Sequence, residues 1–390
     1  MKKIILIGYM PLTEKVEKDF FLSGLMENKV EVEYWDLSGI YFWNVEFRQE
    51  ISRTFVHKIS DYKFLEEAIK RSNDHGTGYA INITFELKVI KLFRMLAANG
   101  CRTIFFARGY IPCYREEGKS FIGKLFSITG IRNIRSLPLR VSGFVLARLL
   151  LPFYRKTGLV RDYDAVFAAG KAAANAYKGM NVIKINYFDY DEYLKQRSVG
   201  PLNGEKYILF LDENLPDHPD FAMFGRDMVE AANYYSSMNR YFKLLEQKYS
   251  MPVVIAAHPK ADYSKNNPFD GRKIFYGQTC ALSRDCALAI VHMSTSVSFP
   301  VLYSKPILFP VTKCMKSIDS GRIEKNVRAF ASELDCEIID VERIKNVNDI
   351  TDLPPVHLKA YEEYKYKYLT SEQTKDTISE NIVIKHLKEL

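Results

Sequence analysis

The sequence predicts an α/β protein of two domains, each built on a doubly wound parallel sheet. Short apolar segments alternate along the chain with segments of helical character, as they do where helices join the strands of a parallel sheet. The chain has 390 residues, more than one hydrophobic core usually serves, so two domains are expected.

The first half contains apolar segments with the length and composition of buried strands. We expect these strands at residues 2–8, 30–35, 79–84, 103–107, 164–170 and 182–186. Helices are expected at 13–28, 44–75, 86–99 and 171–179, the third of them with Gly100 as its C-cap. Together these elements define an N-terminal domain over residues 1–198.

A segment containing Gly and Pro, 195–205, is the predicted linker, and the alternating pattern restarts after it. Strands are expected at 207–211, 252–257, 273–276, 287–291, 306–309 and 336–340, with helices at 226–248, 279–284 and 295–303. These elements define a second domain over residues 205–350. A charged helical tail, 355–390, follows it.

Composition places the chain among ordinary globular proteins. Apolar residues make up 47% and charged residues 26%, which excludes a disordered, collagenous or coiled-coil chain. The six cysteines are scattered without a CxxC pair, which favours buried thiols in a reducing compartment over disulfides or a zinc site. The apolar start of the chain stops at Pro11 and charged residues follow, so we interpret it as a strand and expect a cytoplasmic protein.

Positive charge is concentrated between residues 115 and 161. This segment carries ten basic residues against Glu116 and Glu117, and bulky apolar residues are interspersed among them. Such a mixture is typical of a surface that docks on an anionic membrane, here the inner face of the cell membrane. It is also compatible with two ordinary helices whose apolar faces are core and whose charges are solvated. Nucleic acid is not expected as a partner, because no recognition motif accompanies the charge.

Polar clusters follow four of the apolar strands of the second half. Because the carboxyl ends of parallel strands meet at one edge of the sheet, where ligands of such sheets bind, we expect these clusters to lie together. They are Asp212-Glu213-Asn214 followed by His218-Pro219-Asp220, then His258-Pro259-Lys260, Gly277-Gln278-Thr279, and His292 with Ser294-Thr295-Ser296.

These side chains match the requirements of sugar transfer. A carboxylate can take the proton of an acceptor hydroxyl, and cationic or hydrogen-bonding groups can bind the departing phosphate. Either Asp212 or Glu213 would be the base, and the segments 258–260 and 294–296 would bind phosphate, helped by free backbone N–H groups.

Each candidate also has a purely structural interpretation. The acidic pair can cap a turn, the hydroxyls can cap a helix, and His258 can be an ordinary loop histidine. His292 alternates with strand residues, so a place in the core is as compatible with the pattern as a place in the site. His218, beside Asp217 in a loop, is expected on the surface.

Two Asp-x-Asp triplets, at 162–164 and 189–191, would suit a metal-bound nucleotide sugar, but they lie away from the phosphate-type strand ends. We therefore expect no metal and no other cofactor. The sequence contains no GxxxxGK[ST], no GxGxxG after a strand and no GxSxG, which argues against P-loop, dinucleotide-binding and α/β-hydrolase functions.

The order of the three motifs resembles that of a known group of enzymes. Asp212-Glu213, then His258-Pro259, then Ser294-Thr295 or Thr295-Ser296 is similar to the acidic pair, the HP motif and the paired Ser/Thr motif of bacterial sialyltransferases. Related capsule and lipopolysaccharide glycosyltransferases of GT-B architecture share this pattern. The motifs cover residues 207–310 only, and Asn214 stands where those enzymes have Gly.

The resemblance implies two Rossmann-like domains facing a cleft, with the acceptor on the first domain and the nucleotide donor on the second. It implies that the acidic pair supplies the base, that His258 faces the donor phosphate and that the Ser/Thr hydroxyls bind the same phosphate. Donor-site residues would thus include Pro259, Lys260 and Gly277.

The function expected from these observations is inverting, metal-independent glycosyl transfer. The donor would be a CMP-activated keto-acid sugar such as sialic acid, and the acceptor a surface glycan or lipid-linked glycan. Two alternatives remain open: a CDP- or UDP-dependent glycosyl or polyol-phosphate transferase on the same fold, and a non-catalytic glycan- or nucleotide-binding subunit of a polysaccharide assembly complex.

Overall fold

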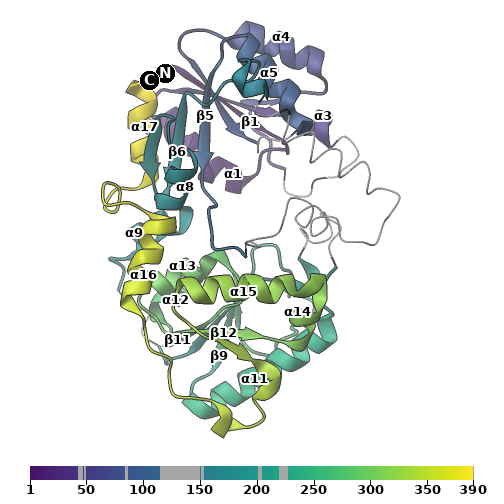
Figure 1. Ribbon diagram of the computed structural model, residues 1–390, viewed down its shortest axis with the longest axis vertical. Helices are drawn as coiled ribbons and strands as arrows, with labels where there is room; N and C mark the ends of the chain where they lie inside the picture. Colours follow the sequence, from purple (N-terminus) through teal and green to yellow (C-terminus); the bar gives the residue numbers. More distant parts are fainter. Residues whose placement is uncertain are drawn as a thin grey trace. The chain divides into compact units, whose positions relative to one another are not determined.

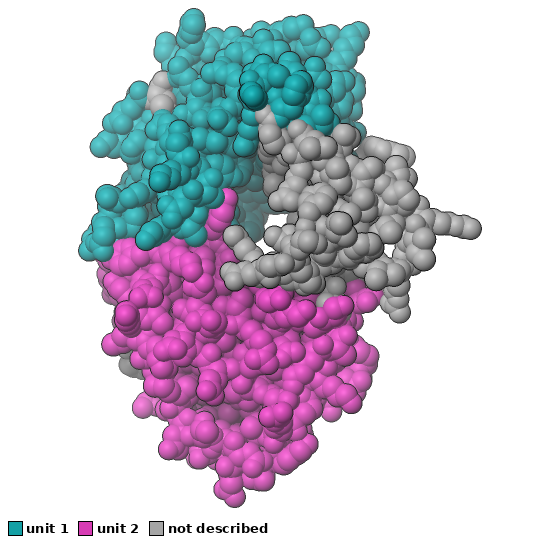
Figure 2. All heavy atoms as spheres, viewed as in Figure 1, with its two compact units in different colours: residues 1–109, 119–186, 371–390 teal, residues 110–118, 187–370 magenta. Residues whose placement is uncertain are grey.

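The computed structural model describes residues 1–42, 47, 50–83, 87–114, 150, 153–200, 204–218 and 227–389. The chain divides into two compact units, coloured separately in Figure 2. Unit 1 comprises Met1–Gly109, Lys119–Asn186 and Ser371–Leu390, and unit 2 comprises Tyr110–Gly118 and Tyr187–Thr370. The end of the chain therefore belongs to the same unit as its beginning.

Unit 1 is built on a parallel sheet of seven strands in the order β3-β2-β1-β4-β5-β6-β7. Its strands are β1 (Lys3–Gly8), β2 (Glu31–Asp36), β3 (Val56–Lys58), β4 (Thr77–Asn82), β5 (Arg102–Ala107), β6 (Ala165–Ala169) and β7 (Val182–Ile185). Strand β1 pairs with β2 on one side and with β4 on the other, so the order reverses at β1. The central strands are almost continuously apolar, because a parallel sheet is covered on both faces.

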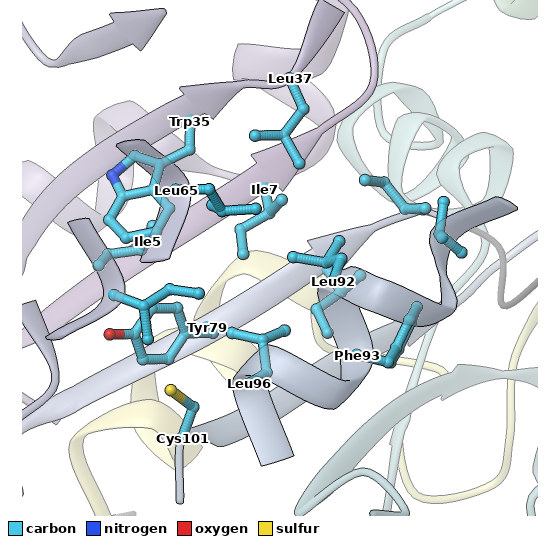
Figure 3. Packing of buried hydrophobic residues seen from close by; sticks show 14 of the residues in the cluster. Ile5, Ile7, Trp35, Leu37, Leu65, Tyr79, Leu92, Phe93, Leu96 and Cys101 are labelled. Carbon is cyan, nitrogen blue, oxygen red and sulfur yellow. The ribbon is translucent and has the colours of Figure 1, made fainter. Parts of the chain in front are cut away.

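Helices join the strands of unit 1 and cover its sheet. They are α1 (Glu14–Asp19), α2 (Leu22–Glu27), α3 (Ser38–Tyr41), α4 (Tyr62–Ser72), η1 (Leu87–Val89), α5 (Ile90–Ala98), α8 (Gly170–Ala176) and α17 (Ser379–Glu389). Figure 3 shows the apolar cluster beneath α4 and α5, where Leu65 and Leu92 pack with Ile5, Trp35 and Tyr79 of the sheet. Each large side chain buried in this way contributes about 1.5–3 kcal/mol.

Two parts of unit 1 differ from the expected elements. The helix expected at 13–28 is two helices, because Phe21 adopts the left-handed backbone conformation with φ of 58° between them. The segment 44–75, expected to be mostly helical, contains the short strand β3 before α4. Strand β3 is only three residues long and carries one apolar residue, so it has no alternation that a sequence pattern could reveal.

Unit 2 is built on a second parallel sheet, of six strands in the order β10-β9-β8-β11-β12-β13. Its strands are β8 (Ile208–Leu211), β9 (Val253–Ala256), β10 (Ile274–Phe275), β11 (Leu288–Ile290), β12 (Ile307–Val311) and β13 (Ile338–Asp340). This is the 3-2-1-4-5-6 order of nucleotide-binding folds, and its order reverses between β8 and β11. The reversal point is where such sheets bind their ligands.

The helices of unit 2 lie on both sides of its sheet. They are α9 (Phe188–Gln196), η3 (Leu215–Asp217), α11 (Ala231–Tyr249), α12 (Thr279–Asp285), η4 (Thr295–Val297), α13 (Ser298–Leu302), α14 (Lys313–Ser317), η5 (Ile318–Gly321), α15 (Arg322–Glu333), η6 (Val341–Arg343), η7 (Val347–Asp349), α16 (Leu358–Tyr364) and the π-helix η8 (Lys365–Leu369). In Figure 1, α12, α13 and α15 lie on one side of the strands and α11 on the other.

The buried face of α11 explains its length. Tyr234, Met238, Tyr241, Phe242 and Leu245 follow one another at helical spacing and are all buried, and the Glu230 side chain caps the first turn. The helix α15, in contrast, lies in a stretch for which the sequence suggested no element.

The two doubly wound parallel sheets expected from the sequence are confirmed, as are helices near the end of the chain. Within the residues that the structure describes, no helix is long and apolar enough to cross a membrane.

Candidate functional site

The polar clusters predicted from the sequence gather at the carboxyl edge of the unit 2 sheet. The pairing of Leu211 with Ala256, and of Phe210 with Ile290, brings the ends of β9, β8 and β11 to the same edge. The ends of β9 and β11 flank β8, so they are separated by two strand spacings, about 10 Å.

Asp212, directly after β8, holds the two neighbouring loops together. Its Oδ1 accepts a hydrogen bond from the backbone N–H of Asn214 at 2.9 Å. Its Oδ2 accepts one from the backbone N–H of His258 at 3.3 Å and one from the hydroxyl of Tyr263 at 2.7 Å. Burial raises the pKa of Asp212, although these hydrogen bonds act in the opposite direction. The side chain is 4% exposed, so its oxygens face the protein.

Glu213 follows Asp212 and connects the end of β8 to the loop after β11, where the strand order reverses. Its Oε1 accepts a hydrogen bond from the backbone N–H of Met293, in the loop after β11, at 2.7 Å. Burial raises the pKa of Glu213 to about 8, with the nearby charge of Asp212 acting in the same direction. Hydrogen bonds from the backbone of Met293, His292 and Ser294 oppose this shift. Backbone N–H groups that we expected to be free for a phosphate are therefore engaged by the protein's own carboxyl group.

His258 follows β9 and is half-buried. Its Nδ1 accepts a hydrogen bond from the backbone N–H of Lys260 at 3.2 Å. In the neutral imidazole this places the proton on Nε2, so Nε2 is the hydrogen-bond donor of the ring. Pro259 and Lys260 are exposed beside it.

The hydroxyl cluster after β11 begins a short helix. Ser294 is the N-cap of η4, and its Oγ accepts a hydrogen bond from the backbone N–H of Ser296 at 3.2 Å. Ser294, Thr295 and Ser296 are all half-buried, so they lie at the rim of the edge and not in its core. Capping thus uses the Ser294 oxygen as an acceptor, while its O–H can still be donated.

Gly277 follows β10, the outermost strand on this side of the sheet, and is exposed with φ of 68°. A Cβ atom at this position would meet no atom within 4 Å, so the space directly beside the backbone is open. Its place two strands from β8 leaves it further from the reversal point than the other candidates.

His292 belongs to the core and not to the site. It is fully buried, its Nδ1 donates to the Pro310 carbonyl at 2.8 Å, and its Nε2 lies 3.0 Å from the Tyr234 hydroxyl. Burial lowers its pKa to about 4, so the ring is neutral.

Of three further residues at this edge, Tyr263 was not recognised in the sequence, Asn214 was named only as part of the polar cluster after β8, and His218 was expected at the surface. Tyr263 contacts Asp212 through its hydroxyl, which also lies 3.4 Å from Asn214 Oδ1. Asn214 adopts the left-handed conformation with φ of 50°, which explains an Asn where the sialyltransferase-like motif has Gly, because these two residue types tolerate it best. The ring of His218, expected at the surface, lies 5.0 Å from that of His258.

Comparisons with known proteins find likeness in structure alone. No protein-family model matches the chain, and no curated protein matches its sequence. The glycosyltransferase of kitacinnamycin has a similar structure, with a TM-score of 0.51 and 9% identity over 99% of this chain and 97% of that one.

Two further structures show lower similarity. The H444N variant of the wall teichoic acid polymerase TagF has a TM-score of 0.49 and 10% identity over 100% of this chain and 89% of that one. MnaA of S. aureus, in a structure with UDP, has a TM-score of 0.44 and 13% identity over 100% of this chain and 96% of that one.

The chain shares a GT-B-like fold of two doubly wound parallel-sheet units with the kitacinnamycin glycosyltransferase. At 9% identity the likeness concerns the fold and not the activity, so the chemistry rests on the residues at the unit 2 edge.

Proposed function

We propose that the chain is a nucleotide-sugar-dependent glycosyltransferase whose donor binds at the carboxyl edge of the unit 2 sheet. The observation that carries this proposal is the convergence of an imidazole, an acidic pair and a hydroxyl cluster at the reversal point between β8 and β11. Nucleotide ligands of parallel sheets bind at such points. Unit 1 would hold the acceptor glycan.

In the proposed reaction an acceptor hydroxyl displaces the nucleotide in one step, which inverts the configuration at the sugar carbon. The new bond forms between the acceptor oxygen and that carbon, and the phosphate leaves with the electron pair of the broken bond. His258 would donate its Nε2 proton or a hydrogen bond to the leaving phosphate, and the hydroxyls of Ser294–Ser296 would bind the same group.

The proton of the acceptor hydroxyl goes to the acidic pair, and we take Glu213 as the base because of its raised pKa. Asp212 accepts three hydrogen bonds that hold the loops, so its protonation would loosen them. Glu213 has a pKa of about 8, close to the neutral pH at which a general base is most effective. Metal is not required in this scheme, because hydrogen bonds from His258 and from the hydroxyls of Ser294–Ser296 stabilise the negative charge of the leaving phosphate.

For the donor we propose a CMP-activated keto-acid sugar, with Lys260 as the cation for the sugar carboxylate. A CDP- or UDP-linked donor on the same site is the alternative within enzymes. A non-catalytic binding subunit is the alternative outside them, and the buried acidic pair speaks against it, since binding alone needs no base.

The first test is calorimetric binding of CMP, CDP, UDP and GDP, each with and without EDTA. We expect CMP to bind most tightly and independently of EDTA, and His258→Ala to weaken binding at least tenfold. His57→Ala, on an exposed position of β3 in unit 1, is the matched control. Preference for CDP or UDP would change the donor class, and binding of no nucleotide would overturn the proposal.

We also propose that the basic segment 115–161 brings the protein to an anionic membrane surface. Most of this segment lies outside the described residues, but Phe153 and Leu159 are 54% and 41% exposed, and Arg155, Lys156 and Arg161 are exposed beside them. Apolar side chains enter the headgroup region while the cations contact anionic lipids.

Co-sedimentation with vesicles tests this surface. We expect the wild type to bind phosphatidylglycerol vesicles more than phosphatidylcholine vesicles, and the double variant Phe153→Ser/Leu159→Ser to bind several-fold less. Leu353→Ser, at a 46% exposed leucine of unit 2, is the control. Equal binding by the double variant and the wild type would exclude these residues from the membrane contact.

A further inference from the structure

Two histidines from different loops meet at the carboxyl edge of the unit 2 sheet. His218 ends the short helix η3, which follows β8, and His258 follows β9. Their ring centroids are 5.0 Å apart and the rings are tilted by 49°. Both side chains are half-buried.

The hydrogen bonding of the edge fixes this pair in place. The Asn214 side chain donates to the Asp217 carbonyl, which immediately precedes His218, at 3.3 Å. The Tyr263 hydroxyl contacts both Asp212 and Asn214, and Asp212 accepts from the backbone of His258. One network therefore anchors the loop that carries His218 and the loop that carries His258.

Two neutral imidazole rings can donate two hydrogen bonds to one ligand, whereas a single neutral ring can donate only one. A neutral imidazole has one N–H donor, and in His258 this donor is Nε2, because Nδ1 accepts from Lys260. A second ring at 5.0 Å adds a second donor, so that the pair can contact two oxygens of one phosphate group. Ring packing alone would need no nitrogen in either ring.

We propose that His218 and His258 act as a pair that binds a phosphate group of the nucleotide donor. The inference rests on the proposed function, because it assumes that a nucleotide binds at this edge. It adds His218 as a second phosphate-binding residue.

The direct test follows the histidine Cε1–H signals of the wild-type protein by NMR during titration with pyrophosphate and with CMP. The His218→Phe and His258→Phe variants assign the two signals. We expect both signals to shift with the same concentration dependence. A shift of the His258 signal alone overturns the pair and leaves the donor site intact. If neither signal responds to either probe, both the pair and the phosphate site are overturned.

Two variants separate hydrogen bonding from ring packing. His218→Phe retains an aromatic ring without a donor, and His218→Gln retains an N–H donor without the ring. Phosphate binding predicts that His218→Phe weakens CMP binding about tenfold or more, whereas His218→Gln weakens it less than about threefold. The reverse order, with His218→Phe binding like the wild type, assigns His218 to packing and overturns the proposal. Circular dichroism of both variants checks that they are folded.

Discussion

The carboxyl group of Glu213 is buried beside backbone N–H groups of the loop after β11, and burial is the main cause of its raised pKa. Its pKa of about 8 lies well above the ordinary value of 4.5. Between these values the folded protein keeps the proton and the unfolded chain releases it. The contribution of Glu213 to stability is therefore complete below about pH 4.5 and is lost as the pH rises through about 8.

Glu213→Gln removes this loss, because an amide cannot ionise and its oxygen can still accept from Met293. We expect the free energy of unfolding of the variant to rise relative to that of the wild type by on the order of 2 kcal/mol between about pH 6 and about pH 8. Thermal unfolding of both proteins across this pH range measures the difference. Glu363→Gln, at an exposed position of α16, is the control and should follow the wild type. Parallel pH profiles of wild type and Glu213→Gln would contradict the raised pKa.

The same titration predicts a pH dependence of transfer. If Glu213 is the base, it acts only when ionised, so kcat/KM should rise with pH and level off above about pH 8. Glu213→Gln should abolish this dependence together with most of the activity. Activity of the Glu213→Gln variant close to that of the wild type would move the base to another residue.

Tyr263 contributes to the site through one hydroxyl. Tyr263→Phe removes the 2.7 Å hydrogen bond to the buried Asp212, and we expect it to lower the free energy of unfolding by about 1–3 kcal/mol in urea. The matched control is Tyr276→Phe: the Tyr276 hydroxyl accepts from the backbone N–H of Tyr263 at 3.0 Å, but the ring is 45% exposed and water can replace it. Equal losses in the two variants would show that Asp212 does not depend on Tyr263.

At this scale the sequence was informative where a residue directly follows a strand. Asp212, Glu213 and His258 could be placed at one edge because strand ends define it. Tyr263 could not, since 51 residues separate it from Asp212 and its loop has no periodic pattern. His218 was expected at the surface, because a ring contact between two loops leaves no pattern in the sequence of either loop.

At the scale of elements, the turn after β11 is held by a buried polar network. His292 connects it to β12 through the Pro310 carbonyl and to α11 through the Tyr234 hydroxyl. Its pKa of about 4 lies below the ordinary 6.5, so the stability it provides is present above about pH 6.5 and is lost as the pH falls through about 4.

His292→Phe should leave the Pro310 carbonyl and the Tyr234 hydroxyl without their partner. We expect a loss of about 2–4 kcal/mol in urea unfolding at neutral pH. The double variant His292→Phe/Tyr234→Phe removes the buried hydroxyl as well and should regain part of that loss. Additive losses from the two substitutions would show that the two side chains are not coupled.

The accuracy of the predicted element boundaries depended on how many periodically spaced apolar residues each segment contains. The long helix α11 (Ala231–Tyr249) has six buried side chains, five of them apolar and at helical spacing, and a helix was predicted at 226–248. Strand β3 and the break at Phe21 have no such signal, since the first is too short and the second depends on one backbone conformation.

At the scale of the whole molecule, the chain returns to unit 1 after completing unit 2. Asn186 is fully buried at the point where the chain leaves unit 1 for unit 2. Its backbone carbonyl accepts a hydrogen bond from the Ser379 hydroxyl, and its side-chain amide donates to the carbonyls of Thr374 and Thr377. Helix α17 contacts α2 and β7, and Leu387 is 1% exposed. The last residues are therefore part of the core of unit 1.

This arrangement predicts that a substitution near the end of the chain lowers the stability of unit 1. Leu387→Ala should lower the stability of unit 1 by about 2–5 kcal/mol, because it leaves a cavity beside Leu22 and Leu25. In hydrogen exchange, amides of α2, β1 and β7 should lose protection, whereas those of β8, β9 and β11 should keep it. Leu358→Ala, at a 64% exposed leucine of α16, should change neither set. Loss of protection in β8 and β9 as well would mean that the two units unfold together, and the carboxyl edge of the unit 2 sheet would then depend on the chain end.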